Sequence, residues 1–371
     1  MAQTKAQLLA GKSDQSVTFN DVTASSLNGG PFGGRNRIIN GDMRIDQRNA
    51  GASVTPTVNV YTLDRWISVI TQVSKFSIQQ NANSVTPPAG FSNYLGVTSL
   101  SAYTVAASDV FVVSQVIEGY NISDLALGTA NAKTFTISFW VRSSLTGTFG
   151  GAVSGGQVYP FTYAISSANT WEYKTVTISG STSGTWNSTN SAGLTLRLSL
   201  GVGSTYSGTA GAWSNTDFYS ATGATSVVGT NGATFYLTGV QLEAGSVATP
   251  FERRSYGQEL SLCQRYYYFI GNDGTNAAIG SGFTTGTTGF VYGALPVEMR
   301  TAPTISYTGT LSDLNFTHTG VSAAANSLTN QGTGRKSYAI SLGSATGTTN
   351  LAGIFARVTS ASTAITFSAE I

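Results

Sequence analysis

Charged side chains are scarce in this sequence of 371 residues: Asp, Glu, Lys and Arg together make up 10% of it, against about 25% in an average soluble protein. The formal net charge of +2 offers no electrostatic reason to expect nucleic acid or an anionic membrane as a partner. Neutral polar residues, mainly Ser, Thr and Asn, are common instead, and the sequence has 43 glycines among them. Such a composition suits β structure with many tight turns, as in extracellular or virion proteins, and not a cytosolic helical enzyme.

Cysteine and histidine are almost absent, with one of each. A single cysteine, Cys263, excludes an intramolecular disulfide, and with one histidine it cannot supply a structural zinc site. Long apolar runs are missing too, since no stretch approaches the about 18 residues of a membrane span. The apolar run near the N-terminus is too short for a signal-peptide core, so we expect neither classical secretion nor membrane insertion.

Apolar residues instead alternate with polar ones in short runs. The four leucines at positions 194, 196, 198 and 200 alternate strictly with Thr195, Arg197 and Ser199, which is the period of a half-buried strand. Gly, Ser, Thr and Asn clusters separate such runs, and many strands with turn-rich connections favour a sandwich or jelly roll. The predicted fold is all-β. Further strands are expected at 110–117, 134–142, 171–178, 289–295 and 351–358.

The stretch 233–254 indicates the closing strand of one large domain. Its alternation slips by one residue at Gly239, which returns Val240 and Leu242 to the face of the earlier apolar residues, as a glycine bulge does. Gly245, Pro250 and a charged cluster then end the apolar pattern.

The chain is therefore divided into four predicted parts. Residues 1–34 carry too little apolar surface to fold alone and are expected to be an attachment arm, with a disordered leader as the alternative. Residues 35–254 form a jelly-roll domain, 255–268 a connector in which a short helix passes into a strand, and 269–371 a second β-sandwich module. Because two charged clusters, at 35–48 and 252–265, bracket the large domain, we expect ion pairs at domain boundaries or between subunits.

Several aromatic residues are candidates for ligand contact. Trp140 lies on the polar face of its strand, where a tryptophan can stack on a sugar ring; packing under a loop or against a neighbouring subunit is the alternative. Glycine-rich loops carry four more, and there loop anchoring or subunit packing competes with ligand contact. Tyr338, beside Arg335 and Lys336, is a further candidate, with a solvated turn as the alternative. The four loop residues are Trp186, Tyr206, Trp213 and Tyr219.

Several motifs together resemble bacteriophage tail-fibre and prophage fibre proteins, over roughly residues 36–305, and the central part resembles the jelly roll of carbohydrate-binding modules. The motifs are NRIINGDMRIDQR from Asn36, YTLDRW from Tyr61, FTISFWVRSS from Phe135, FYLTGVQLEAG from Phe235, LCQRYY from Leu262 and MRTAP from Met299.

The resemblance implies a homotrimeric virion fibre, made in the host cytoplasm, that adheres to surface polysaccharide or lipopolysaccharide. Its N-terminal arm would bind other tail or baseplate proteins, and its C-terminal module would face the host. In a trimer the connector could lie near the threefold axis, with Cys263 behaving as a small buried apolar residue. A capsid-decorating fibre and a polysaccharide depolymerase remain alternatives.

The sequence predicts no catalytic residues, no metal ligands and no cofactor. A depolymerase needs a pair of carboxylates, and the acidic residues between positions 49 and 251 are sparse and widely spaced. Carbohydrate-binding modules of this kind hold a calcium ion between an Asn-Gly start and the last strand. Here Thr238 and Gly239 stand where a pair of aspartates is expected, and calcium prefers carboxylate ligands.

Overall fold

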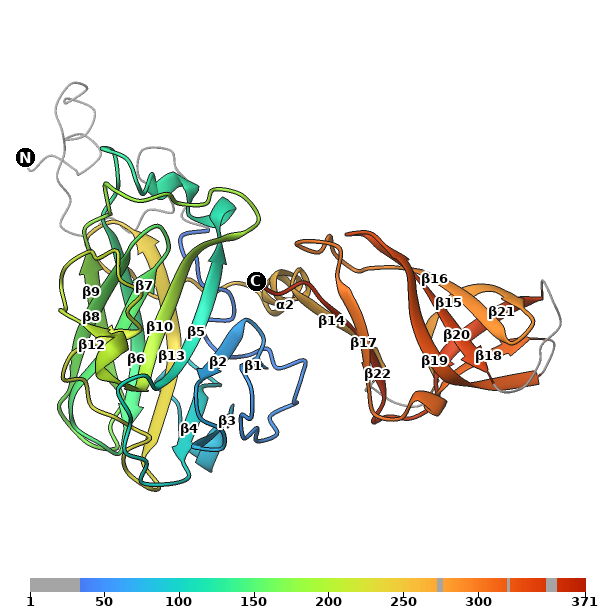
Figure 1. The fold of residues 1–371 in the computed structure, drawn as a ribbon, viewed down its shortest axis with the longest axis horizontal. Helices are drawn as coiled ribbons and strands as arrows, with labels where there is room; N and C mark the ends of the chain where they lie inside the picture. Colours follow the sequence, from blue (N-terminus) through green and yellow to red (C-terminus); the bar gives the residue numbers. More distant parts are fainter. Residues whose placement is uncertain (1–33, 272–275, 319–320, 345–351) are drawn as a thin grey trace, which may run out of the picture. The chain divides into compact units, whose positions relative to one another are not determined.

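The computed structural model describes residues 34–271, 276–318, 321–344 and 352–371 (Figure 1). Within them the chain is almost entirely β, with one α-helix and a few short 3-10 turns, which confirms the predicted all-β fold. The attachment arm predicted for residues 1–34 falls almost wholly outside the described residues and stays a prediction. No helix in the described ranges is long and apolar enough to cross a membrane.

A sandwich of two antiparallel sheets forms the large domain (Figure 1). The five-stranded sheet has the order β3-β4-β13-β6-β9, and the six-stranded sheet has the order β1-β2-β5-β10-β7-β8. Their inward residues form one core, in which the four alternating leucines of β10 are at most 1% exposed. The strands are β1 Val60–Leu63, β2 Trp66–Ile70, β3 Phe76–Gln80, β4 Leu95–Ser99, β5 Val110–Glu118, β6 Phe135–Ser143, β7 Gly147–Ser154, β8 Val158–Ile165, β9 Glu172–Ile178, β10 Ala192–Val202 and β13 Thr234–Ala244, with the short pair β11 Ser207–Gly208 and β12 Ser220–Ala221.

The closing strand β13 lies at the centre of the five-stranded sheet, between β4 and β6. Its register against β6 shifts between Thr238 and Gln241, so the predicted bulge at Gly239 is confirmed. The segment that begins the domain pairs with the same strand, since the Arg37 N–H donates to the Leu242 carbonyl at 2.9 Å. Start and end of the domain therefore meet on β13.

The predicted connector is found as helix α2 (Tyr256–Gln264) followed by β14. Ser255 caps the helix, because its hydroxyl accepts the Gln258 N–H at 3.3 Å, as capping serines do. Cys263 is fully buried in a small cluster with Ile39 and Tyr266, and burial raises the pKa of its thiol. It therefore behaves as the small buried apolar residue that was expected.

The C-terminal module has its own hydrophobic core. A closed barrel of six strands, in the order β15-β16-β20-β19-β18-β21, stands beside a three-stranded sheet, β14-β22-β17, so the expected second sandwich is in detail a barrel with a small sheet. Two separate cores agree with two modules, although the residue boundaries themselves stay predictions. The elements are β14 Tyr267–Gly271, β15 Ala277–Thr285, β16 Thr288–Ala294, β17 Thr304–Thr308, β18 Leu314–His318, β19 Val321–Thr333, β20 Ser337–Ser344, β21 Gly353–Val358 and β22 Ala364–Ser368; the 3-10 turns are η1 Ala82–Ser84, η2 Gly119–Asn121, η3 Ser123–Leu125, η4 Ser204–Tyr206 and η5 Leu311–Asp313.

Arg48, in the first of the two charged clusters, and Arg65, which lies outside both clusters, form buried ion pairs with Glu370. Arg65, 1% exposed at its side chain, pairs with Glu370, and Arg48 binds the other oxygen of that carboxylate at 2.8 Å. The Arg65 guanidinium also stacks over the Tyr266 ring, 3.4 Å from its centroid. Ion pairing at a domain boundary, expected from the sequence, is therefore confirmed.

Asp64 in this region is expected to make stability depend on pH. Burial is the largest influence on its carboxyl and raises its pKa to about 6 from 3.8. Between pH of about 6 and about 4 the folded chain binds a proton there that the unfolded chain does not, so this group's contribution favours folding as the pH falls. The gain is up to about 3 kcal/mol.

The free energy of unfolding, measured by urea titration at pH 7 and pH 4.5, checks this contribution of Asp64. Asp64→Asn should lose the gain at the lower pH, so that wild type improves relative to the variant between pH 7 and pH 4.5. Asp124→Asn, at a carboxylate with a 49% exposed side chain, is the control. If wild type and Asp64→Asn differ in free energy of unfolding by the same amount at pH 7 and at pH 4.5, the raised pKa of Asp64 is contradicted.

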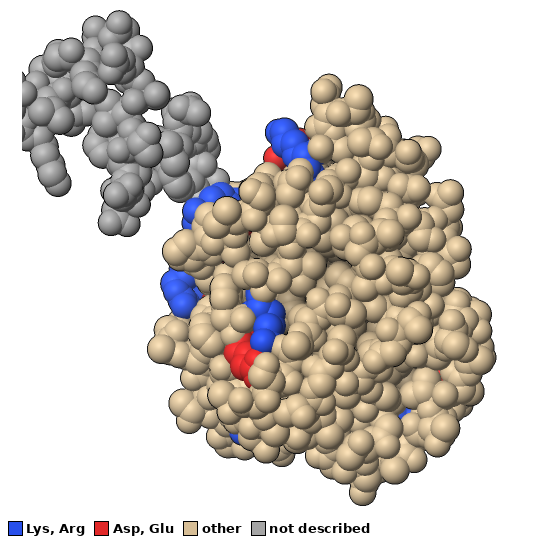
Figure 2. Space-filling view, turned by 90° about the vertical axis from the view of Figure 1, so that its left-hand side faces the viewer, with Lys and Arg blue, Asp and Glu red and all other residues tan. Residues whose placement is uncertain are grey.

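The surface of the large domain carries few charges. On the face shown in Figure 2 the charged side chains are few and scattered, and neutral residues cover nearly all of it. Any ligand recognised there meets mainly hydroxyls, amides, backbone and aromatic rings, together with the occasional single charge.

Candidate functional site

The outer face of the five-stranded sheet presents two neighbouring aromatic rings. On β6, Phe139 and Val141 point into the core with no exposed area, so the residues between them point outward. Trp140 is one of these, and its partner across the ladder is Tyr173 on β9. The two ring centroids lie 5.4 Å apart at 50°, and Tyr173 is 43% exposed. The strand period thus places an aromatic pair on a sheet face that reaches solvent.

The bulge at Gly239 makes room for a third ring beside Trp140. The glycine has a φ of +61°, and an added Cβ would lie 2.7 Å from the Phe91 ring and 3.2 Å from Trp140 Cδ1. Phe91 comes from the loop between β3 and β4. A side chain at position 239 would therefore push Phe91 away from the sheet.

Gly239→Ala is expected to lower both stability and the order of these rings. The left-handed conformation costs a residue with a Cβ about 1–2 kcal/mol, and the contact with Phe91 adds to this. Gly223→Ala is the matched control, because Gly223 has a φ of +78° with nothing within 4 Å of its added Cβ. Thermal unfolding should show a larger loss for Gly239→Ala, and equal losses would argue against tight packing at the bulge.

The segment after β13 folds back over the same face and forms a wall. Thr249 donates its N–H to Glu243 at 2.8 Å and its hydroxyl to the other carboxylate oxygen at 2.7 Å. The Gln241 side-chain oxygen accepts the Glu252 N–H at 2.8 Å. Since Gln241 and Glu243 are buried, the wall is fixed by satisfied polar groups.

Sheet, loop and wall enclose an open groove of about 460 Å³, which we call the Trp140 groove. Aromatic rings and small polar side chains line it, a composition typical of sites for small polar ligands. The residues that the following argument uses are Phe91, Ser138, Trp140, Tyr173, Phe251 and Arg253.

Trp140 differs from the other four tryptophans of the chain in its indole N–H. Each of the others donates to a backbone carbonyl, whereas Trp140 has no hydrogen-bond partner among the described residues, although buried or half-buried indoles usually find one. Its N–H therefore stays free to bind a ligand in the groove. The four bonds are Trp66 to Asn40 at 3.0 Å, Trp171 to Thr86 at 2.9 Å, Trp186 to Ser183 at 3.0 Å and Trp213 to Ser179 at 2.8 Å.

The four loop aromatics expected as ligand contacts lie away from this groove and pair with one another. Trp186 and Trp213 meet edge to face at 5.6 Å and pack against the main core. Tyr206 and Tyr219 meet at 5.6 Å, and Arg197 lies over the Tyr219 ring at 3.8 Å. Their half-buried pairing favours the alternative of loop anchoring, and ligand contact there stays a prediction.

Tyr338 is not a surface contact, and that prediction is corrected. It lies on β20, is 3% exposed and packs 4.8 Å from the Phe367 ring. Its hydroxyl donates to the Ile279 carbonyl inside the module. The adjacent Arg335 and Lys336 suggested a turn, but the strand begins immediately after them and its first apolar residue points inward.

Tyr173, Phe91, Phe251 and Arg253 were missed by sequence reasoning. The strand alternation would have placed Tyr173 on the face of Trp140 had the two strands been known to pair. Phe91 and Phe251 lie in loops, where no period predicts the direction of a side chain. Arg253 was assigned only to a charged cluster.

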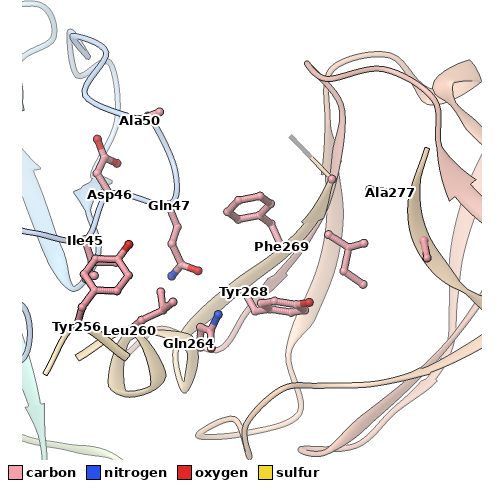
Figure 3. Close-up of a pocket in the computed structure, with 13 residues that line it drawn as sticks. Ile45, Asp46, Gln47, Ala50, Tyr256, Leu260, Gln264, Tyr268, Phe269 and Ala277 are labelled. Atoms are coloured by element: carbon pink, nitrogen blue, oxygen red, sulfur yellow. The ribbon is translucent and has the colours of Figure 1, made fainter. Parts of the chain in front are cut away.

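A second cavity, of about 570 Å³, lies between the segment from Ile45 to Ala50, helix α2 and strand β14 (Figure 3). Its polar groups are largely engaged: Asp46 accepts the backbone N–H groups of Asn49 and Gly51 at 2.9 and 2.7 Å, and the Gln47 amide donates to Asp64 at 2.7 Å. Fewer groups are therefore ready to bind a polar ligand than in the Trp140 groove.

Metal or acid–base chemistry has little support at either place. Within the described ranges, no group of three or more His, Cys, Asp and Glu side chains could hold a metal ion. The Trp140 groove has no carboxylate among its lining residues. Its geometry suits binding through rings, hydroxyls and one guanidinium.

No protein-family model matches the sequence, and no curated protein matches it. Some solved structures are similar at low TM-scores, which do not establish a shared fold. A putative sugar binding protein from Bacteroides thetaiotaomicron is 12% identical, with 57% of this chain and 100% of that chain covered and a TM-score of 0.36. The CBM22-1 xylan-binding domain from Paenibacillus barcinonensis is 13% identical, with 54% and 99% covered and a TM-score of 0.28. Tailspike protein 4 of bacteriophage CBA120 is 11% identical, with a TM-score of 0.29; the match covers 57% of this chain but 21% of the tailspike chain.

Proposed function

We propose that this chain is a structural protein of a bacteriophage virion, a homotrimeric tail fibre that adheres to glycans on the host surface through the Trp140 groove. The observation that carries the binding proposal is Trp140 itself, whose ring lies beside Tyr173 on the outer face of the sheet and lines the groove, and whose N–H has no hydrogen-bond partner among the described residues. A ring in this position has no role in the core. Its exposure, with that of Tyr173, is most simply explained by a ligand.

The chemistry of the groove matches a sugar. One face of a hexose ring presents C–H groups that pack on the flat rings of Trp140 and Tyr173. Its hydroxyls lie at the ring's edge, where the Trp140 N–H and the Ser138 hydroxyl offer hydrogen bonds. The groove has no carboxylate among its lining residues and one guanidinium, that of Arg253, so it adds no electrostatic repulsion for a neutral polysaccharide chain.

The trimer supplies strength that one groove lacks. Three linked sites raise the effective concentration of the second and third contacts, so each site need only be millimolar to hold a virion. Helix α2 is the expected contact between copies, because Tyr256 at its start is 57% exposed and lines the cavity beside it. The sequence resemblance to phage fibres supports this arrangement, with residues 1–34 attached to other tail proteins.

Binding of the full chain to an array of purified bacterial lipopolysaccharides and capsular polysaccharides tests the proposal. We expect at least one glycan to be bound, without release of reducing sugar, and a solution mass by light scattering of three times 38.5 kDa. No binding to any arrayed glycan would overturn the adhesion role. Release of reducing sugar would identify a depolymerase instead, and a monomeric mass would overturn the fibre.

A further inference from the structure

Arg253 is the one charged residue that lines the Trp140 groove. Its side chain is exposed, and its guanidinium lies 4.6 Å from the centroid of the Phe91 ring and 5.7 Å from that of Phe251. The two rings meet edge to face at 5.3 Å. Arg253 therefore has a packed position beside the groove and does not extend loosely into solvent.

The backbone around Arg253 is also held. The preceding N–H, of Glu252, binds Gln241, and Gly90 leaves the space that the guanidinium fills, since an added Cβ there would lie 3.0 Å from Arg253 Nη2. Gly90 has a φ of +84°, so a side chain at this position is disfavoured by conformation as well as by contact. Cation–π contact and a tailored space orient the guanidinium before a ligand arrives.

The guanidinium has no ion pair or hydrogen bond among the described residues, although its neighbours include acids. Glu243 accepts two bonds from Thr249, Glu252 accepts the Asn36 N–H at 2.6 Å, and Asp42 pairs with Arg44 at 2.5 Å. The charge of Arg253 also acts on Asp42, where it opposes the rise in the pKa of that buried carboxyl, and one Asp42 oxygen has no hydrogen-bond partner among the described residues, but no ion pair joins the two side chains. The N–H donors of Arg253 therefore have no acceptor among the described residues and can bind a partner outside the chain.

We propose that the Trp140 groove selects acidic glycans, and that Arg253 binds the anionic group, a carboxylate or a phosphate, on a sugar whose neighbour stacks on Trp140. This inference rests on the proposed glycan-binding function and gives it a substrate class. The planar fork of an arginine matches both anions in a bidentate manner. Arg253 sets which glycan is bound, whereas Trp140 supplies the stacking that any sugar would use.

The experiment uses the full chain and defined polysaccharides: polygalacturonate, alginate, the carboxyl-reduced neutral form of each, and a glycerol-phosphate teichoic acid, beside the array described above. Every arrayed glycan that binds is also tested after its acidic groups are reduced or removed. We expect the neutral form to bind about 10-fold or more weakly, as for the loss of a charge-assisted hydrogen bond. Binding of the acidic form should also weaken with salt.

Variants separate the charge from the groove. Arg253→Gln should lose the preference for the acidic form, so that the ratio of the two affinities falls to about 1. Gly90→Ala should lose part of this preference, because the added side chain displaces the guanidinium. Arg142→Gln is the control, because Arg142 also lies over a ring on this sheet face, 5.3 Å from the Tyr236 centroid, but does not line the groove. Its preference should be unchanged.

The outcomes distinguish this inference from the function on which it rests. Binding only of neutral glycans, or equal binding of both forms, overturns the acidic selectivity and leaves glycan adhesion intact. An unaltered preference in Arg253→Gln also overturns it. Binding of teichoic acid without the uronates would assign the anion as phosphate and support the inference, whereas absence of all glycan binding removes both proposals.

Discussion

Replacing Arg65 by methionine is expected to destabilise the protein by about 3–5 kcal/mol, the usual cost of removing one partner of a buried ion pair. Glu370 would lose one of its two cations, and the Val116 carbonyl would lose the N–H that Arg65 donates at 2.5 Å. The stacking on Tyr266 would be replaced by a smaller thioether contact. Methionine fills the space, so the loss reports charge and hydrogen bonds more than a cavity.

The free energy of unfolding by urea, followed by tryptophan fluorescence, measures this effect of Arg65→Met. Lys336→Met is the control, because Lys336 pairs with Glu298 at 3.4 Å while its side chain is 77% exposed, and such pairs contribute less than about 1 kcal/mol. Limited proteolysis should cleave Arg65→Met faster than wild type in the connector between the sandwich domain and the C-terminal module, because the ion pair that joins Arg65 to Glu370 is lost. A variant as stable as wild type would mean that Arg48 alone compensates the Glu370 carboxylate.

Replacing Trp140 by alanine is expected to weaken glycan binding by about 30-fold or more, as for a tryptophan at the centre of a binding site, where truncation costs at least about 2 kcal/mol. The loss should apply to acidic and neutral glycans alike, because stacking does not depend on charge. Trp140→Phe retains a flat ring but has no N–H, so an intermediate loss is expected. The loss in Trp140→Phe relative to wild type reports mainly the hydrogen bond, and the difference between the two variants reports the stacking.

Surface plasmon resonance against an immobilised glycan from the array, with thermal unfolding to verify folding, measures the affinities of these variants. Trp171→Ala is the matched control: Trp171 packs on the same sheet face, 6.4 Å from the Tyr236 ring, but its N–H is used by Thr86 and it does not line the groove. It should bind as wild type does. Equal losses in Trp140→Ala and Trp171→Ala would attribute the effect to the sheet and not to the groove.

The periodic parts of the molecule could be predicted from residue order. Strict alternation in β10 and β6 determined which side chains face the core, and the one-residue slip at Gly239 predicted the bulge, because side-chain direction in a strand depends only on counting residues. The short helix before β14 followed from a local change of period, since Leu260, Cys263 and Tyr267 fall at helical spacing. Trp140 was identified as an outward ring by the same counting.

Side chains outside a periodic element could not be placed in this way. Tyr338 was proposed as a ligand contact, with a solvated turn as the alternative, because charged residues precede it. It is instead the first inward residue of strand β20, and the sequence gives no signal for where that strand begins. Trp186 and Trp213 were expected to contact ligand because their loops are rich in glycine. In the structure the two rings pack against each other, and this contact removes aromatic surface from water as a ligand would.

The sequence by itself determined the all-β class, the division into a large sandwich and a second module, and the outward direction of the Trp140 ring, since each depends on contacts near in sequence or on composition. Only the tertiary structure decided that Tyr173, Phe91, Phe251 and Arg253 join that ring. They come from a paired strand, a loop and the segment that folds back after β13, and their meeting depends on strand order, on the space left by Gly239 and Gly90, and on the buried bonds of Gln241 and Glu243. Those are long-range contacts, and local propensity carries no information about which distant segments will share one face.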